Sequence, residues 1–168
     1  MAIIVEDGSI VSGANSYTTV SGVDSYATDY GYTDWTAVSS TIKTQSLLRA
    51  MRYIEGLSFK GIRQTEGQAL EFPRSDLYDK DGYLIEENTI PLSIVKALCE
   101  VCILSLPGSD VDLQPAKNSD DKRTKLVIAD VITEEWKLGN ISRERSTIVM
   151  DMLKGLVKSN SIVEVERG

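Results

Sequence analysis

The chain has 168 residues, of which 42% are hydrophobic and 26% charged, as expected for one globular domain with a real core. Its formal net charge of −7 argues against nucleic acid held by a broad basic face, since phosphate contacts supply most non-specific affinity. No apolar run reaches the length of about 18 residues that a membrane span needs, and the start "MAIIVEDG" lacks the basic flank of a signal peptide, so we expect no membrane contact and a protein that acts in the cytoplasm or in something assembled there.

The hydrophobic pattern predicts a mainly α, compact four-helix domain over residues 1–168, with a β-hairpin excursion, a late strand and a C-terminal tail. Short apolar runs at 3–5 and 10–11 flank "EDGS" and suggest a small hairpin. Apolar residues at helical spacing predict helices near 21–31, 39–56, 91–106 and 142–158. Ser21 is the expected cap of the first helix, Gly31 its end, and Pro91 the first residue of the third.

The third predicted helix is apolar on nearly every side, which is typical of a central helix covered by others. Its carboxylate Glu100 would be costly if buried alone, so we expect an ion pair with Arg49 or Arg52 on the neighbouring helix. Cys99 and Cys102 lie in the same apolar run. Without histidine or a second cysteine pair they are expected to be core residues, not a zinc or redox site.

The segment 69–90 holds six acids between Glu71 and Glu87, and three readings of it can be weighed. A calcium loop would need acids where Leu77 and Asn88 stand, so its first ligand and its bidentate ligand are missing. Nothing in the sequence gives two of the carboxylates different environments, as an acid–base pair requires. Asp81-Gly82 between "LYDK" and "YLI" is a hairpin signal, so a turn is the favoured reading and no metal is expected.

Residues 125–136 are rich in β-branched side chains and predict one long strand, bent if necessary. A single strand leaves backbone groups unpaired, so its partner must be the amino-terminal strands, the tail 161–168, or another copy of the chain. The tail "SIVEVERG" alternates in a way that suits a strand added to another chain.

Several motifs recur in an order that resembles a known family. They are "ANSY" at 14–17, a tyrosine-containing helix ending near Tyr30, Trp35, "LLRAMRYIEG" at 47–56, "GIRQTEGQALEFPR" at 61–74, "DLYDKDGYLI" at 76–85 and "IP" at 90–91. Together they resemble the head-tail adaptor family of tailed bacteriophages, whose members often carry the label DnaT-like single-stranded-DNA-binding protein. The resemblance covers nearly the whole chain. The middle loop 107–124 departs from it, being longer and more polar.

The resemblance implies a structural virion protein with no enzymatic activity and no cofactor. Such a protein forms a ring of about twelve copies beneath the portal, extends the DNA channel without binding DNA specifically, and docks a tail or stopper protein. Its place is the neck of the virion, assembled in the bacterial cytoplasm. The expected partner-interface residues are Tyr78, Asp79, Asp81, Tyr83, Ile128, Val131, Trp136, Ile162, Val163, Val165 and Arg167.

Two other function classes remain open on the residues alone. Tyr17, Tyr26, Tyr30, Tyr32 and Trp35 could stack on bases in a single-stranded-DNA-binding module, but such a module also needs a basic groove that the sequence lacks. Core packing is therefore the better explanation of these aromatic residues. A small carboxylate-dependent enzyme is the third alternative.

Overall fold

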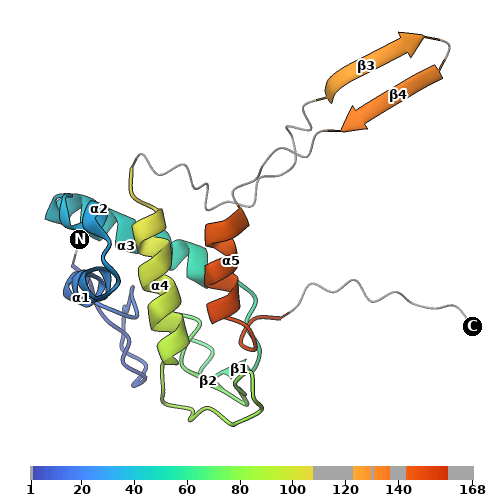
Figure 1. Cartoon of the computed structure of the whole chain (residues 1–168). Coiled ribbons are helices and arrows are strands. Elements are labelled where there is room, and N and C mark those ends of the chain that lie inside the picture. Colours follow the sequence, from blue (N-terminus) through green and yellow to red (C-terminus); the bar gives the residue numbers. More distant parts are fainter. Residues whose placement is uncertain (1, 108–122, 130, 137–142, 159–168) are drawn as a thin grey trace, which may run out of the picture.

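The computed structural model describes residues 2–107, 123–129, 131–136 and 143–158 (Figure 1). The helices within these ranges are α1 (Val20–Tyr30), α2 (Thr33–Thr36), α3 (Ser40–Glu55), α4 (Leu92–Leu104) and α5 (Arg143–Met152). The strands are β1 (Ile62–Arg63), β2 (Arg74–Ser75), β3 (Arg123–Ala129) and β4 (Val131–Trp136). The protein is thus mainly helical, as predicted, with the four expected helices and the short additional helix α2.

Local capping chemistry sets the ends of the first helices. Thr19, in an extended conformation, caps α1 by accepting a hydrogen bond from the Gly22 N–H at 3.0 Å, so the prediction of Ser21 as the cap was wrong by two residues. Gly31 ends α1 with a φ of 75°, as predicted, because glycine enters the left-handed region without steric cost. Ser39 caps α3 and Gly56 follows its last residue, so the helix lies within the predicted range 39–56.

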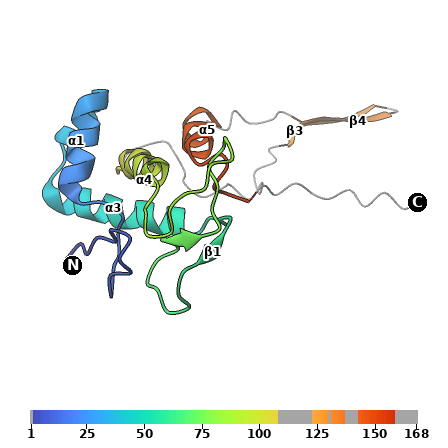
Figure 2. The ribbon, with the colours of Figure 1, turned by 90° about the horizontal axis from the view of Figure 1, so that it is seen from below.

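Helix α4 is the centre of the core. It packs against α1, α3 and α5, and Figure 2 shows it between α5 and the α1–α3 pair. Cys99 and Cys102 are buried free thiols on this helix, which confirms them as core residues. Pro91 is the N-cap of the helix, which begins at Leu92, so the prediction of Pro91 as its first residue was wrong by one position. The helix ends at Leu104, two residues earlier than predicted.

The amino-terminal segment does not form the predicted hairpin. Val5 pairs instead with Ser16 in a parallel bridge, and the Glu6 N–H donates to the Ser16 carbonyl at 2.8 Å. The buried Glu6 carboxylate accepts hydrogen bonds from the backbone N–H groups of Gly8, Ile10 and Val11 at 2.9, 3.0 and 2.8 Å. Because a side chain takes these donors, the segment curls around Glu6 and cannot continue as a two-stranded ladder.

The single late strand predicted at 125–136 was also wrong. Its two halves are β3 and β4, which pair antiparallel with Ile128 opposite Ile132, Ala129 opposite Val131 and Arg123 opposite Trp136. Folding back on itself gives each half the backbone partner that a lone strand would lack. Figures 1 and 2 both show the β3–β4 hairpin apart from the helices.

The last helix is shorter than the predicted 142–158, because α5 ends at Met152. After a turn at Gly155, which has a φ of 97°, the chain runs back beside the residues that follow α3. Phe59 and Val157 form an antiparallel bridge there, and the Lys60 N–H donates to the Leu156 carbonyl at 2.8 Å.

Candidate protein-interaction surface

The segment 77–85 is an ordered β-hairpin, as its sequence predicted. The Asp79 N–H donates to the Tyr83 carbonyl at 2.9 Å, the Ile85 N–H donates to the Leu77 carbonyl at 2.8 Å, and Tyr78 lies opposite Leu84. The loop holds three residues and closes with Gly82, whose φ of 88° suits the last position of such a loop.

Buried contacts fix this hairpin to the helical body. Leu77 is only 1% exposed and Ile85 packs partly buried against the core. At the tip, Gly155 lies so close to Lys80 that an added Cβ would come within 2.9 Å of the Lys80 Cα atom. The turn after α5 therefore supports the tip of the hairpin, and only glycine fits at that contact.

A second set of contacts holds the segment that leads into the hairpin. The Glu55 carboxylate, at the end of α3, accepts hydrogen bonds from the Tyr17 hydroxyl and from the Glu71 N–H. Burial raises the pKa of the Glu55 carboxyl. Arg74 is buried and donates to the Lys60 and Gly61 carbonyls at 2.7 and 2.9 Å, and to the Glu71 carboxylate at 2.6 Å.

The outward side of the hairpin is apolar and exposed. Tyr78 is 52% exposed and its cross-strand partner Leu84 is 61% exposed, while Tyr83 next to the turn is 74% exposed. Tyr78 and Leu84 are called the hairpin face below; Tyr83 lies opposite Asp79, one residue along the strand, and therefore points to the other side of the ribbon. Tyr78 and Tyr83 were predicted from the sequence as interface residues, whereas Leu84 was not. Once the turn at Gly82 is located, strand pairing places Leu84 opposite Tyr78.

The stretch that carries the hairpin face is rich in acidic side chains. The stretch 76–87 contains Asp76, Asp79, Asp81, Glu86 and Glu87, and its only base is Lys80. Asp79 has a structural role: its carboxylate accepts hydrogen bonds from the N–H groups of Asp81 and Tyr83 at 2.9 and 2.8 Å. Asp81 is exposed, so of these two predicted interface acids only Asp81 is free of such a task within the described chain.

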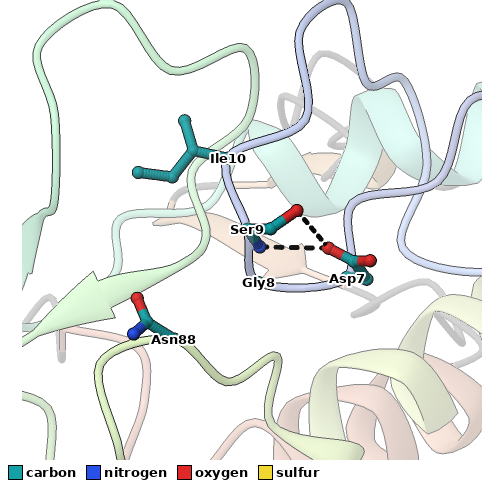
Figure 3. Close-up of a pocket in the computed structure, with 5 residues that line it drawn as sticks. All are labelled: Asp7, Gly8, Ser9, Ile10 and Asn88. Atoms are coloured by element: carbon teal, nitrogen blue, oxygen red, sulfur yellow. Dashed lines mark hydrogen bonds between the residues drawn. The ribbon is translucent and has the colours of Figure 1, made fainter.

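An open hollow of about 420 Å³ adjoins the end of the hairpin segment (Figure 3). It is lined by Asp7, Gly8, Ser9, Ile10 and Asn88. The loop 7–10 approaches Asn88 so closely that a Cβ on Gly8 would lie 1.9 Å from the Asn88 carbonyl oxygen. Hydrogen bonds from the Ser9 hydroxyl and N–H hold the pKa of the Asp7 carboxyl below its usual value. Ligand pockets are mostly apolar and enclosed, whereas this hollow is open and only about half of its lining is apolar.

The predicted ion pair of Glu100 with Arg49 or Arg52 was wrong. Both arginines are exposed, and the buried Glu100 carboxylate instead accepts hydrogen bonds from the Tyr26 hydroxyl at 2.6 Å and the Tyr32 hydroxyl at 2.9 Å. Tyrosine can supply a donor at the end of an apolar ring, so it satisfies a buried carboxylate without burying a second charge.

Most of the aromatic residues that could stack on bases in a DNA-binding module belong to the core. Tyr17, Tyr26 and Trp35 are buried, which confirms the packing explanation for these three. Tyr30 is exposed, and its ring stacks on that of Tyr26 with the centroids 4.4 Å apart. Tyr30 is therefore the one residue of the set that presents a largely open ring.

Of the other predicted interface residues, Ile128, Val131 and Trp136 lie in β3 and β4, where only the backbone is described. Ile162, Val163, Val165 and Arg167 lie outside the described residues, as does the whole tail 161–168. Within the described ranges, no three histidine, cysteine, aspartate or glutamate side chains gather as metal ligands would. None of the described helices combines the length and apolar character that a membrane crossing needs.

Comparison with known proteins gives one match. The family described as "Putative DnaT-like ssDNA binding protein" matches residues 1–168. Neither the curated proteins nor the solved structures contain a match to the chain. Because the family match spans every residue, the chain belongs to the DnaT-like ssDNA-binding family.

Proposed function

We propose that this protein is a structural virion component, a head-to-tail adaptor. In this role, about twelve copies form a ring beneath the portal, extend the DNA channel and dock a tail or stopper protein. The protein performs no enzymatic reaction, its place is the neck of the virion, and genomic DNA passes through the ring without specific binding.

The observation that carries the proposal is the β3–β4 hairpin. It is a two-stranded sheet with no further described strand beside it, and it lies apart from the helices in Figures 1 and 2. A two-stranded hairpin is at best marginally stable in water, and both of its edges can accept another strand. A ring supplies the missing neighbour to every copy at once, because each copy meets the next through the same pair of surfaces.

The charge of the chain supports a channel rather than a DNA-binding surface. At a net charge of −7 it repels phosphates, which reduces adhesion of DNA that must pass through. The hairpin face adds exposed apolar side chains within an acidic stretch, a composition that suits contact with protein.

The test compares the full chain with a variant in which residues 124–135 are replaced by a short Gly-Ser linker. No helix is touched, so circular dichroism and the melting temperature should change little. Light scattering of the concentrated protein, and incorporation into particles in infected cells, should both decrease strongly. Unchanged assembly of the variant would refute the role of the hairpin in the ring.

A second candidate function, single-stranded DNA binding, is favoured by the description of the family. The exposed ring of Tyr30, stacked on Tyr26, offers one place for a base. Asp29 and Asp34 are exposed close to it in the chain and oppose a phosphate backbone.

Fluorescence anisotropy with a labelled oligothymidine separates the two candidates. A binding module should bind at low salt with an affinity that decreases steeply as salt is added, and Tyr30→Ala should weaken that binding. An adaptor should show no binding that depends on Tyr30. Tyr83→Ala is the matched control, because Tyr83 is also an exposed tyrosine among acids.

A further inference from the structure

We infer that the hairpin face, formed by Tyr78 and Leu84, docks onto a basic surface of a different protein. The occupant is neither a second copy of this chain nor nucleic acid. The inference rests on the proposed function in one respect only, since an adaptor must dock proteins other than itself. It adds the place of one such contact and the chemistry of the partner.

The first support is the rigidity of the hairpin. Leu77 is buried, the Asp79 carboxylate accepts hydrogen bonds from two N–H groups of the turn, and Gly155 packs on the backbone of Lys80. A loop that is already held in one conformation loses little entropy when it binds.

The second support is the residue composition of the face. Tyr78 and Leu84 lie opposite each other across the two strands, and each exposes more than half of its surface, at 52% and 61%. Covering these two side chains releases the water that contacts them, and this release favours binding. Tyrosine is among the residues that most often dominate protein interfaces, where a polar rim surrounds an apolar centre.

The third support, which selects the occupant, is charge. Asp76, Asp81, Glu86 and Glu87 are exposed in the stretch 76–87 that carries the face, with Lys80 as the only base in that stretch. Two copies meeting through this face would bring these acids together, and phosphates would meet the same repulsion. A surface that carries arginine or lysine beside apolar groups matches both the rim and the centre.

The test titrates the full-length protein with a short synthetic peptide that alternates arginine and leucine. Two-dimensional NMR follows the backbone signals, and calorimetry gives the affinity. One comparison peptide carries glutamate for arginine, and another carries serine for leucine. The expected result is that signals of 76–87 shift with the first peptide, and that both comparison peptides bind at least about tenfold more weakly.

Two pairs of variants locate the binding. Tyr78→Ser with Leu84→Ser should lower the affinity for the first peptide by about tenfold. Ile148→Ser, which removes an exposed apolar side chain from α5, should leave that affinity unchanged. Asp81→Asn with Glu87→Gln should weaken binding and its salt dependence. Asp29→Asn with Asp34→Asn removes the same charge from α1 and α2 and should have a smaller effect.

Three results would overturn the inference. The first is peptide binding that is equal in the Tyr78→Ser/Leu84→Ser variant or spread over the whole acidic surface. The second is self-association of the chain that the same variant abolishes. The third is binding of oligothymidine with shifts in 76–87. Each of these leaves ring formation, which is measured separately by light scattering, to be judged on its own.

Discussion

The Tyr26–Glu100 contact allows a quantitative prediction. Tyr26→Phe removes the hydroxyl that lies 2.6 Å from the Glu100 carboxylate and keeps the ring that stacks on Tyr30. Burial and the hydrogen bond with Glu100 raise the pKa of the Tyr26 hydroxyl, so it stays protonated and able to donate. A hydrogen bond to a carboxylate contributes about 1.5–3 kcal/mol, and we expect the variant to lose that much of the free energy of unfolding.

The Tyr32 hydroxyl is the second donor to Glu100, so a double variant should lose more stability than Tyr26→Phe alone. Tyr26→Phe with Tyr32→Phe removes every hydrogen bond that Glu100 accepts within the described chain. Breaking all partners of a buried charge costs about 3–5 kcal/mol, a large part of the roughly 5–15 kcal/mol that holds a domain folded. Adding Glu100→Met should recover much of the loss, because an apolar group needs no partner.

Urea unfolding followed by circular dichroism at several temperatures measures these differences. For a chain of this size, about 1 kcal/mol corresponds to roughly 2–4 °C in Tm. Tyr30→Phe is the matched control, since Tyr30 is exposed and its hydroxyl takes no part in the Glu100 contact. If Tyr26→Phe were as stable as the natural chain, or if Arg49→Ala or Arg52→Ala were as costly, the pairing described here would be refuted.

Three further predictions concern other parts of the molecule. Burial raises the pKa of the Asp24 carboxyl, but hydrogen bonds from Lys43 and Trp35 outweigh it and hold the pKa below its usual value of 3.8, so this stabilisation is present above that pH and is lost as the pH falls through the lowered pKa. Asp24→Asn should therefore cost roughly 1 kcal/mol in urea unfolding at pH 7, and a difference that persisted undiminished at pH 3 would contradict this. Gly155→Ala should lower Tm because φ is 97° and the Lys80 backbone leaves no room for a Cβ, whereas Gly67→Ala, at an open position, should change Tm little; equal effects would be evidence against support of the hairpin tip. Deleting residues 161–168 should leave the helical signal and Tm nearly unchanged and reduce incorporation into particles; particles that incorporate the truncated chain normally would show that docking lies elsewhere.

The sequence by itself determined the helices and the main turn. Apolar spacing located α1, α3, α4 and α5, since one face of each must be buried whatever it packs against. Gly31 marked the end of α1 through its own backbone preference, and Asp81-Gly82 marked the hairpin turn. These signals act within a few residues, so they can be read without knowing the fold.

Only the tertiary structure decided which distant groups meet. Glu100 accepts hydrogen bonds from two tyrosine hydroxyls and does not pair with an arginine. The reason is that α1 and the turn at Tyr32 lie against that side of α4, whereas the flank of α3 that carries the arginines is exposed. The β-rich run 125–136 became two paired strands, since its pattern of β-branched residues is the same whether or not the chain reverses at its middle. Asp79 turned inward to the N–H groups of its own turn, while Leu84 faced outward. The side on which a residue lies depends on where the rest of the chain packs, and that information is not local.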